Sequence, residues 1–296
     1  VFTRAGNYYK DDAVDHPARQ NEETMTVVHI EGKTGLDNLD EIIAAFDGFM
    51  VARGDLGVEC PLEDVPFLQK RIIEQARLNA KPVIVATQML ESMISAPAPT
   101  RAEASDVANA VLDGADAVML SVETSVGDHP VTTVETMARI ITSTENHALA
   151  SNGSGVATID WDPHTRSGVI AKAAAEVAER VGAKYVVAFT TSGDTARRMA
   201  RLRGRVPLLA FTPENIVRSQ LSLTWGVETF RTVEVEHTDE MVRQVDEQGG
   251  FGSEAMAGAA AIGRLAEVAR ENALRRLAGG ELVGFACAID PATWAA

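Results

Sequence analysis

Short apolar runs alternate with longer segments of helical period between residues 27 and 147, and this alternation most constrains the fold. Between and after the runs, apolar residues recur every three or four positions, as in amphipathic helices. A strand and helix repeat of this kind predicts parallel strands joined by right-handed helical crossovers. The predicted strands are VVHIE (27–31), GFMVAR (48–53), KPVIVATQ (81–88) and DAVMLS (116–121).

These predicted strands are apolar almost throughout, so both faces of their sheet should be covered. A barrel and a doubly wound sheet both meet this requirement. We therefore expect residues 27–149 to form one α/β domain. Residues 1–26 are polar and aperiodic, which suggests a fragment boundary or an N-terminal arm with little order.

A second series of strands and helices follows residues 150–165, which are rich in Gly, Ser, Asn and Pro and are predicted to form a linker. Residues 166–296 are expected to form a smaller open α/β domain, with a divergent Ala- and Gly-rich tail from Gly249. The tail continues into a helix-like segment and an apolar run, at 264–279 and 281–289. Earlier in this domain the predicted strands are 184–189, 207–211 and 227–230, and the predicted helices are 167–181, one from about 195, 214–223 and 238–247.

The composition excludes several classes of protein. A formal charge of -15 and a pI near 4.8 disfavour nucleic-acid binding, because such proteins present clustered Lys and Arg. No apolar stretch reaches the length of a membrane span, and the N-terminus lacks the pattern of a secretion signal. Cys60 and Cys287 show no CxxC spacing, so we interpret both as packing residues of a cytoplasmic protein.

Polar side chains follow each predicted strand of the first domain. The strands end at Glu31, at Asp55, at Thr87 with Gln88, and at Ser121 with Glu123. In parallel α/β folds these ends meet at one rim, where ligands bind. The alternative is that such residues are N-caps of the following helices. Capping explains Glu31 and Glu123 less well, and Asp55 is expected to lie several residues before its helix.

Two rim carboxylates without a His or Cys cluster favour a hard cation such as Mg²⁺ or Mn²⁺. Such ions bind one or two carboxylates and complete their shell with water and substrate oxygens. We therefore predict Glu31 and Asp55 as metal ligands. Gly54 allows close approach of the backbone to a ligand, with the neighbouring amides available to an anionic group. Thr87 supplies a hydroxyl able to donate a hydrogen bond or relay a proton.

Three long stretches resemble the pyruvate kinase family, from the middle of its catalytic (β/α)8 barrel into its C-terminal domain. The stretches are MVARGDLGVECPLEDVPFLQKRIIEQARLNAKPVIVATQMLESM (50–93), PTRAEASDVANAVLDGADAVMLSVETSVGDHP (99–130) and AFTTSGDTARRMARLRGRVPLLAFTP (188–213). They occur in the family's order, within a resemblance that covers residues 27–247. The resemblance implies half of a (β/α)8 TIM-type barrel followed by an open α/β domain.

The resemblance also implies chemistry and partners. Glu31 and Asp55 match the family's divalent-metal ligands, Thr87 its active-site threonine, and Gly54 the backbone that holds the substrate carboxylate. The family transfers phosphate from phosphoenolpyruvate to ADP in glycolysis, giving pyruvate and ATP, with Mg²⁺ and commonly K⁺. It builds allosteric homotetramers. Segments matching the family's K⁺ ligands are not in this sequence.

Departures from the family pattern weaken the expectation of activity. His29 replaces a lysine whose ammonium neutralises charge on the transferring phosphoryl group, and a histidine is mostly neutral at pH 7. Lys33 is close in sequence but past the strand end. Val122 replaces a glycine, which is expected to crowd its loop.

Half a barrel would leave exposed strand edges and an open apolar interior. Three readings stay open: a longer parent polypeptide, pairing of two copies, or a degenerate relative. Residues 1–26 show no resemblance to the missing half.

A loop in the second domain forms another candidate site. FTTSGDTARR (189–198) runs from a strand through hydroxyl residues and a glycine into a helix, which presents free amides to a phosphate. By resemblance it binds a phosphorylated effector, while a plainly capped helix explains the pattern equally well. Asp194 would oppose an anion if it pointed inward. The predicted effector residues are Thr190, Thr191, Ser192, Gly193 and Thr195.

Three functions follow from these observations. The first is a pyruvate kinase-type phosphotransferase in which Glu31 and Asp55 hold Mg²⁺, Thr87 assists proton delivery, and His29 stands at the lysine position. The second is a metal-dependent lyase acting on an oxoacid. The third is an inactive regulatory or assembly relative, which His29 and the missing half barrel favour.

Overall fold

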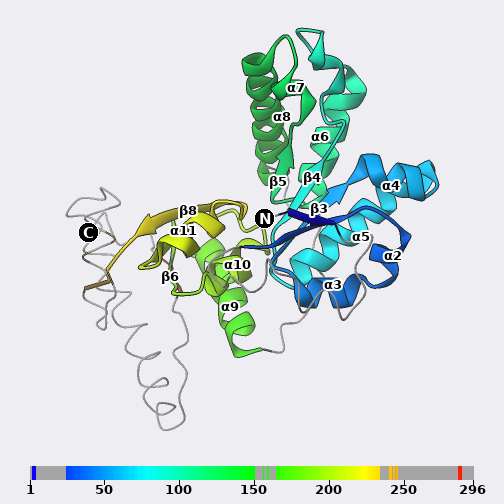
Figure 1. The fold of residues 1–296 in the computed structure, drawn as a ribbon. Helices are drawn as coiled ribbons and strands as arrows, with labels where there is room; N and C mark the ends of the chain where they lie inside the picture. The colour runs from blue at the N-terminus through cyan, green and yellow to red at the C-terminus, as the bar shows by residue number, and fades with distance from the viewer. Residues whose placement is uncertain are drawn as a thin grey trace. The chain divides into compact units, whose positions relative to one another are not determined.

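A computed structural model of the chain shows two compact units, residues 1–160 and residues 161–296 (Figure 1). The structure describes residues 2–4, 25–150, 156, 159, 165–233, 240, 241, 243, 245 and 286–288.

The first unit contains a five-stranded parallel sheet in the order β1-β2-β3-β4-β5. This arrangement confirms the predicted half barrel, with strands that lie in space in the order in which they occur along the chain. The strands are β1 (Phe2–Arg4), β2 (Val27–Ile30), β3 (Gly48–Ala52), β4 (Val83–Ala86) and β5 (Ala117–Met119). The helices are α2 (Lys33–Asp37), α3 (Leu39–Ala45), α4 (Arg53–Glu59), α5 (Val65–Leu78), α6 (Arg101–Asp113), α7 (Val122–Ser125) and α8 (Pro130–Ala150), with short 3-10 turns at Leu62–Asp64 and Glu91–Ile94.

Both faces of this sheet are buried, as the apolar strands predict. On one face Val28, Phe49 and Val85 join a core with helices α3, α5 and α6. On the other face Met50 and Ile84 belong to a separate cluster of buried side chains. Figure 1 shows α3 and α5 beside the first strands and α6 beside α8. Side chains alternate between the two cores because strand residues point to opposite faces in turn.

Aspartates at the amino ends of β3 and β5 help to set the strand register. The Asp47 carboxylate accepts a hydrogen bond from the Thr26 amide at 2.9 Å. In the same way the Asp116 carboxylate accepts from the Val83 amide at 3.0 Å. Each aspartate precedes one strand and holds the start of its neighbour, so the repeated local pattern also specifies pairing.

Helix α6 begins with a capping box that also anchors the preceding 3-10 turn. The Thr100 hydroxyl accepts from the Glu103 amide, and the Glu103 carboxylate accepts from the Thr100 amide. The same carboxylate accepts from both the amide and the hydroxyl of Ser92. Burial alone would raise the pKa of Glu103, but the hydrogen bonds from Ser92 and Thr100 outweigh it and lower that pKa.

The second unit contains a four-stranded sheet in the order β8-β7-β6-β9, in which β9 runs antiparallel to β6. On one face Phe189, Phe211 and Phe230 stack from three neighbouring strands, with ring centroids 5.1 and 5.0 Å apart. The strands are β6 (Val186–Phe189), β7 (Leu208–Thr212), β8 (Val227–Arg231) and β9 (Ala286–Ala288). The helices are α9 (Arg166–Arg180), α10 (Asp194–Ala200) and α11 (Asn215–Leu221).

Several elements differ from the sequence-based expectation or lie outside the described residues. Strand β1 falls within residues 1–26, where no strand is expected, and β9 falls within the apolar run 281–289. Of the helix expected over 238–247, residues 240, 241, 243 and 245 are helical. Most of the linker 150–165, and the helix expected over 264–279, lie outside the described residues.

Replacing the capping carboxylate should destabilise the first unit in a pH-dependent way. We expect Glu103→Gln to lower the free energy of unfolding by roughly 1–2 kcal/mol at pH 7, the usual cost of a lost cap. The pKa of Glu103 is lowered in the folded chain, so its contribution is present above the unfolded pKa and is lost as pH falls through the folded pKa. Urea unfolding at pH 7 and pH 3.5 measures this, and an equal deficit at both values would contradict it.

Candidate functional site

The carboxyl ends of β2, β3, β4 and β5 meet at one edge of the first unit's sheet, because these strands are parallel neighbours. Glu31 directly follows β2 and Asp55 lies in α4, which directly follows β3. Thr87 follows β4, and Glu123 lies in α7 just beyond β5. The structure therefore places the predicted rim residues on neighbouring strand ends.

Two of the rim residues occupy different local structure from that expected. Strand β3 ends at Ala52 and α4 begins at Arg53, so Asp55 lies in the first turn of a helix. The helix that Asp55 was expected to precede is α5, which begins at Val65, so that expectation agrees with the structure, but the short helix α4 before it was not expected. A carboxylate in a first helical turn is favoured by the helix dipole. Glu123 also serves its own backbone, because its carboxylate accepts from the Ser121 amide at 2.8 Å.

Direct contacts link neighbouring parts of the rim. The Gly54 amide donates to the Thr87 hydroxyl at 2.9 Å, which joins the ends of β3 and β4. At the end of β2, His29 Nδ1 lies 3.4 Å from Glu31 Oε1, and both side chains are mostly buried. Glu31 is therefore held by the residue that stands at the family's lysine position.

The backbone at Thr87 is strained. Thr87 and Gln88 have φ angles of +72° and +54°, in the left-handed region that a β-branched residue rarely adopts. Such conformations cost about 1–3 kcal/mol each and cluster at functional sites. The Thr87 hydroxyl also donates to the Ala86 carbonyl at 2.6 Å. Surrounding contacts therefore hold both the hydroxyl and the backbone of this residue.

Arg53 supplies a further part of the rim that sequence reasoning missed. One guanidinium nitrogen contacts both carboxylate oxygens of Asp106, at 2.7 and 2.6 Å. The other donates to the Thr87 carbonyl at 2.7 Å. The arginine side chain is only 12% exposed, although it follows an apolar strand. A buried cation requires a partner, but nothing in the local spacing identifies a carboxylate so far along the chain.

The rim can hold a divalent cation only with help from other ligands. Among the described residues, no group of three or more His, Cys, Asp or Glu side chains is arranged to hold a metal ion. Two carboxylates with water and substrate oxygens remain a suitable ligand set for Mg²⁺ or Mn²⁺. Glu59, at the end of α4, lies against Gly32 and adds another carboxylate near Glu31.

The structure also describes Val122 and Lys33, for which the sequence analysis considered effects on the rim. Val122 is 47% exposed at the start of α7, so its side chain points outward in part and does not fill the loop. Lys33 lies in α2 and pairs with the Asp37 carboxylate at 2.9 Å, with its side chain 75% exposed. Lys33 is therefore engaged elsewhere and does not replace the family's lysine in this structure.

The predicted effector loop of the second unit makes several hydrogen bonds within itself and to helix α10. The Thr190 hydroxyl accepts from the Gly193 amide at 2.9 Å, and the Ser192 hydroxyl accepts from the Asp194 amide at 3.4 Å. The Asp194 carboxylate turns to Arg198, whose Nε donates to it at 2.6 Å. Thr191 is exposed. The N-cap of α10 is Gly193, which has no side-chain cap hydrogen bond, and Asp194 is paired with a cation.

Helix α10 also brings arginines close to this loop. Arg197 donates to the Ser192 carbonyl at 2.9 Å. Burial, and to a smaller extent the charge of neighbouring Arg198, lowers the pKa of Arg201 to about 10, while Asp194 opposes the change. Thr195 lies half-buried in the first turn of the helix. The loop therefore combines exposed hydroxyls with positive charge, which an anionic ligand would require.

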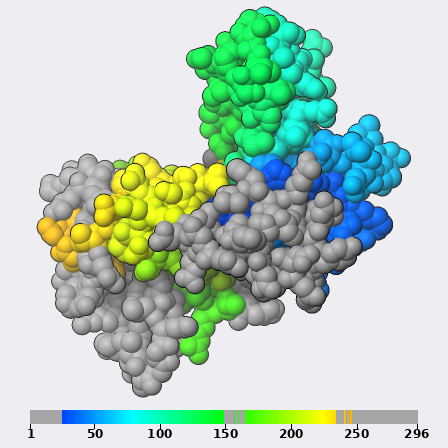
Figure 2. Space-filling view, viewed as in Figure 1, coloured from blue at the N-terminus to red at the C-terminus, as the bar shows by residue number. Residues whose placement is uncertain are grey.

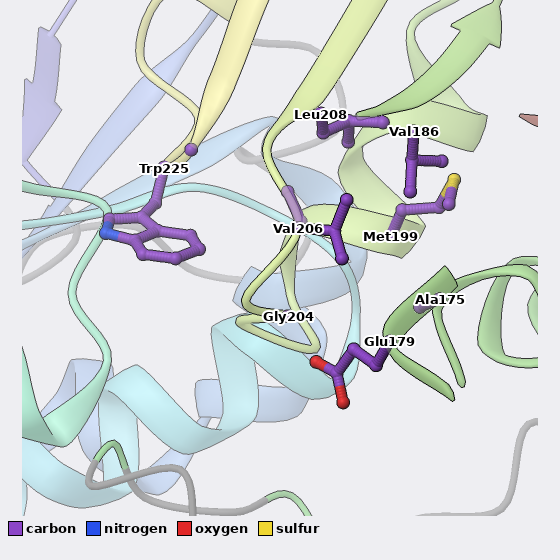
Figure 3. A pocket seen from close by; sticks show the side chains of 10 residues that line it. Ala175, Glu179, Val186, Met199, Gly204, Val206, Leu208 and Trp225 are labelled. Atoms are coloured by element: carbon purple, nitrogen blue, oxygen red, sulfur yellow. The ribbon is translucent and has the colours of Figure 1, made fainter. Parts of the chain in front are cut away.

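A cleft in the second unit is too small for a metabolite (Figure 3). Met199, Val206 and Leu208 form much of its apolar wall, and Trp225 and Glu179 lie around it. It holds about 30 Å³, whereas sites for small molecules hold roughly 300–1,000 Å³. The Glu179 carboxylate already accepts from the Arg205 amide at 3.0 Å. This cleft is a packing gap between α9, α10 and the sheet.

Apolar side chains are exposed around the turn between α4 and α5. Val58, Leu62 and Phe67 are 85%, 75% and 70% exposed. Figure 2 shows this part of the chain as a light-blue projection at the surface. Exposed apolar patches of this kind are typical of interaction surfaces.

None of the helices in the described part of the chain is both long and apolar enough to cross a bilayer.

The two units match two different domain models of one family. Residues 10–134 match the model of the pyruvate kinase barrel domain, and residues 168–262 match that of the pyruvate kinase alpha/beta domain. The first match begins at residue 10, inside the segment 1–26 in which no resemblance to the missing half of the barrel was expected, so residues 10–26 also fall within the match to the barrel domain. The second match extends past Gly249 into the tail.

Individual pyruvate kinases are also similar to this chain in sequence and in structure. A pyruvate kinase of Mycobacterium tuberculosis (strain ATCC 25618 / H37Rv) is 58% identical over 220 residues, covering 74% of this chain and 46% of the relative. A pyruvate kinase of Corynebacterium glutamicum is 57% identical, covering 74% and 45%. A crystal structure of a pyruvate kinase from Cryptosporidium parvum superposes with a TM-score of 0.71 at 33% identity, covering 84% of this chain and 54% of that one. The chain spans about half the length of the curated relatives it matches.

The packing around Gly54 gives a test of why a glycine occupies this position. A Cβ added there would meet its nearest atom, Thr87 Oγ1, at an ordinary 3.5 Å. We expect Gly54→Ala to leave the free energy of unfolding unchanged or to raise it by up to about 1 kcal/mol. At Gly127 the added Cβ would lie 2.4 Å from the Glu123 carbonyl oxygen, so Gly127→Ala should destabilise by about 1–3 kcal/mol. Thermal unfolding of both variants measures the contrast, and strong destabilisation by Gly54→Ala would contradict it.

Proposed function

Because this chain belongs to the pyruvate kinase family, we propose that it serves phosphoryl transfer from phosphoenolpyruvate to ADP, giving pyruvate and ATP. The observation that carries the proposal is the direct link between Gly54 and Thr87 at the rim where Glu31 and Asp55 also lie. Family resemblance assigns roles to all four residues. The chain spans about half of its relatives, so the activity of the whole enzyme is part of the proposal.

Glu31 and Asp55 would hold Mg²⁺ or Mn²⁺ on neighbouring strand ends. When bound, the metal ion supplies Lewis-acid stabilisation of negative charge on the transferring phosphoryl group and the enolate oxygen. The side chains differ in freedom, since Glu31 is largely buried beside His29 whereas Asp55 is exposed. We infer that Glu31 is the preorganised ligand and that Asp55 orients when the ion and substrate arrive.

The substrate carboxylate would be held by backbone amides at the start of α4. The first amides of a helix have no partner within it, so they are available to an anion. The Gly54 amide already donates to the Thr87 hydroxyl, so the amides beside it would take the carboxylate. The open space at Gly54 lets the substrate come close to the backbone.

Thr87 would assist proton delivery to the methylene carbon of the enolate. Its hydroxyl lies at the end of β4 and is fixed by the Gly54 amide and the Ala86 carbonyl. A positioned hydroxyl avoids the cost of orienting a donor during the reaction. A proton leaving this hydroxyl would be replaced from solvent, because Thr87 is only partly buried.

The remaining family properties belong to the same proposal. K⁺ would assist as it commonly does in the family, and the enzyme would work in cytoplasmic glycolysis as an allosteric homotetramer. The exposed apolar side chains Val58, Leu62 and Phe67 support assembly with further copies. A phosphorylated effector would meet Thr191, Ser192 and Thr195 beside Arg197, where positive charge lies close to exposed hydroxyls.

An assay of the purified chain tests the proposed function. With phosphoenolpyruvate, ADP, Mg²⁺ and K⁺ present, pyruvate should form, and Asp55→Asn and Glu31→Gln should each lower turnover on the order of a hundredfold. Calorimetric titration with Mn²⁺ should show weakened binding in both variants. Asp37→Asn is the matched control, because it removes an exposed carboxylate that pairs with Lys33.

Three other results of the activity assay would contradict parts of this proposal. Oxaloacetate decarboxylation that requires Mg²⁺, without phosphoryl transfer, would favour a lyase. No reaction with either substrate, with effector binding retained, would favour a regulatory relative. Turnover that survives Asp55→Asn unchanged would remove the metal from its proposed position.

His29 provides a second test of the mechanism. Restoring an ammonium with His29→Lys should raise turnover by at least about tenfold, since a positioned charge at a phosphoryl group is worth about that much or more. Lys33→Ala should leave turnover unchanged, because Lys33 is paired with Asp37. Steady-state kinetics at pH 7 measures both effects. Equal turnover of His29→Lys and the parent chain would show that the position carries no such role.

A further inference from the structure

The dipeptide Arg53–Gly54 contacts both the side chain and the backbone of Thr87, which has an unfavourable backbone conformation. The Gly54 amide binds the Thr87 hydroxyl, and the Arg53 side chain binds the Thr87 carbonyl. The hydroxyl and the carbonyl are thus fixed from the same short segment at the end of β3. Two left-handed residues in succession, Thr87 and Gln88, would relax without such contacts.

Asp106 determines where the Arg53 side chain lies. Its two oxygens meet one guanidinium nitrogen at 2.7 and 2.6 Å, while the other nitrogen reaches Thr87. Arg53 is 12% exposed and Asp106 is 36% exposed, so solvent screens the pair only in part. Asp106 lies in the middle of α6, an element that packs behind the sheet. A rigid helix therefore fixes the arginine that fixes the threonine.

The other contacts of the Arg53 side chain also lie close to Thr87. Besides Asp106 and Thr87, its second nitrogen lies 2.9 Å from Met89 Sδ and 3.4 Å from the Gln88 carbonyl. All these partners belong to α6 or to residues 87–89. Its planar group spans a carboxylate and a carbonyl at fixed geometry, which a lysine could not match.

We propose that Arg53 and Asp106 are positioning residues for Thr87, and that the Asp106 carboxylate controls proton delivery without touching the substrate. The inference rests on the proposed function, in which the Thr87 hydroxyl serves the enolate. Loss of the carboxylate frees the guanidinium, the Thr87 carbonyl loses its donor, and the hydroxyl leaves its position beside Gly54. Proton transfer then slows while binding of ADP is unaffected.

Asp106→Asn tests this directly, because the amide keeps the shape of the side chain and removes its charge. We expect kcat to fall about tenfold or more, with the KM for ADP changed by less than about twofold. Exchange of pyruvate methyl protons with D₂O should fall by the same factor as kcat. Arg53→Lys should act in the same direction, since a lysine keeps the charge but not the fork.

Asp113→Asn is the matched control. Asp113 lies on the same helix and pairs with Lys70 and Gln69 on α5, away from Thr87. It should lower stability without changing the proton exchange rate. In a Thr87→Ala background, Asp106→Asn should cost no further activity, because both substitutions remove the same step. Additive losses would overturn the proposal, as would equal kinetic effects of Asp106→Asn and Asp113→Asn.

Amide hydrogen exchange at Gly54 separates this inference from the proposed function. The Gly54 amide is protected by the Thr87 hydroxyl, so Asp106→Asn and Arg53→Lys should each speed its exchange several-fold. Asp113→Asn should not. This measurement does not require turnover. If the parent chain is inactive, the proposed function is contradicted, but the exchange rate of the Gly54 amide still tests the role of Arg53 and Asp106. Unchanged exchange at Gly54 in both variants would overturn the positioning role.

Discussion

Parallel pairing between β2, β3, β4 and β5 is the constraint on which the candidate site depends. The register is continuous, with His29 opposite Met50 and Val51 opposite Val85, so the carboxyl ends of the strands meet at one edge. Buried apolar side chains on both faces prevent any strand from slipping, because a shift by one residue would exchange the two cores. Residues that are distant in sequence therefore lie together at the carboxyl edge of the sheet without long connecting loops.

A comparison of two strand-to-helix loops shows where the chain accepts strain. In the second unit the left-handed position after β6 is taken by Gly193, with φ of +81°, and the loop closes on its own hydroxyls. In the first unit Thr87, which directly follows β4 and has a branched side chain, also has a positive φ. A glycine would relieve the strain but would supply no hydroxyl to the rim. The contacts from Arg53 and Gly54 offset that cost, which is the pattern expected of a residue kept for its chemistry.

Much of the fold could be predicted from the sequence, because period-two and helical patterns are local. The four main strands of the first unit lie within the predicted runs, and the rim positions of Glu31 and Thr87 followed from them. Other features depend on tertiary contacts. The pairing of Arg53 with Asp106 joins residues on different elements, and no local spacing encodes it. The short helix α4 was missed because it directly follows the apolar run of β3 and carries no helical period of its own long enough to identify.

The charge balance of the rim bears on the metal ion of the proposed function. The chain carries a net charge of -15, and the rim adds Glu31, Asp55 and Glu59 to that field. The nearby basic side chains are already committed, Arg53 to Asp106 and Lys33 to Asp37. His29 Nδ1 contacts Glu31 Oε1 at 3.4 Å. Under the proposed function an anionic substrate would meet this negative charge, and a divalent ion held by the same carboxylates would reverse the local sign.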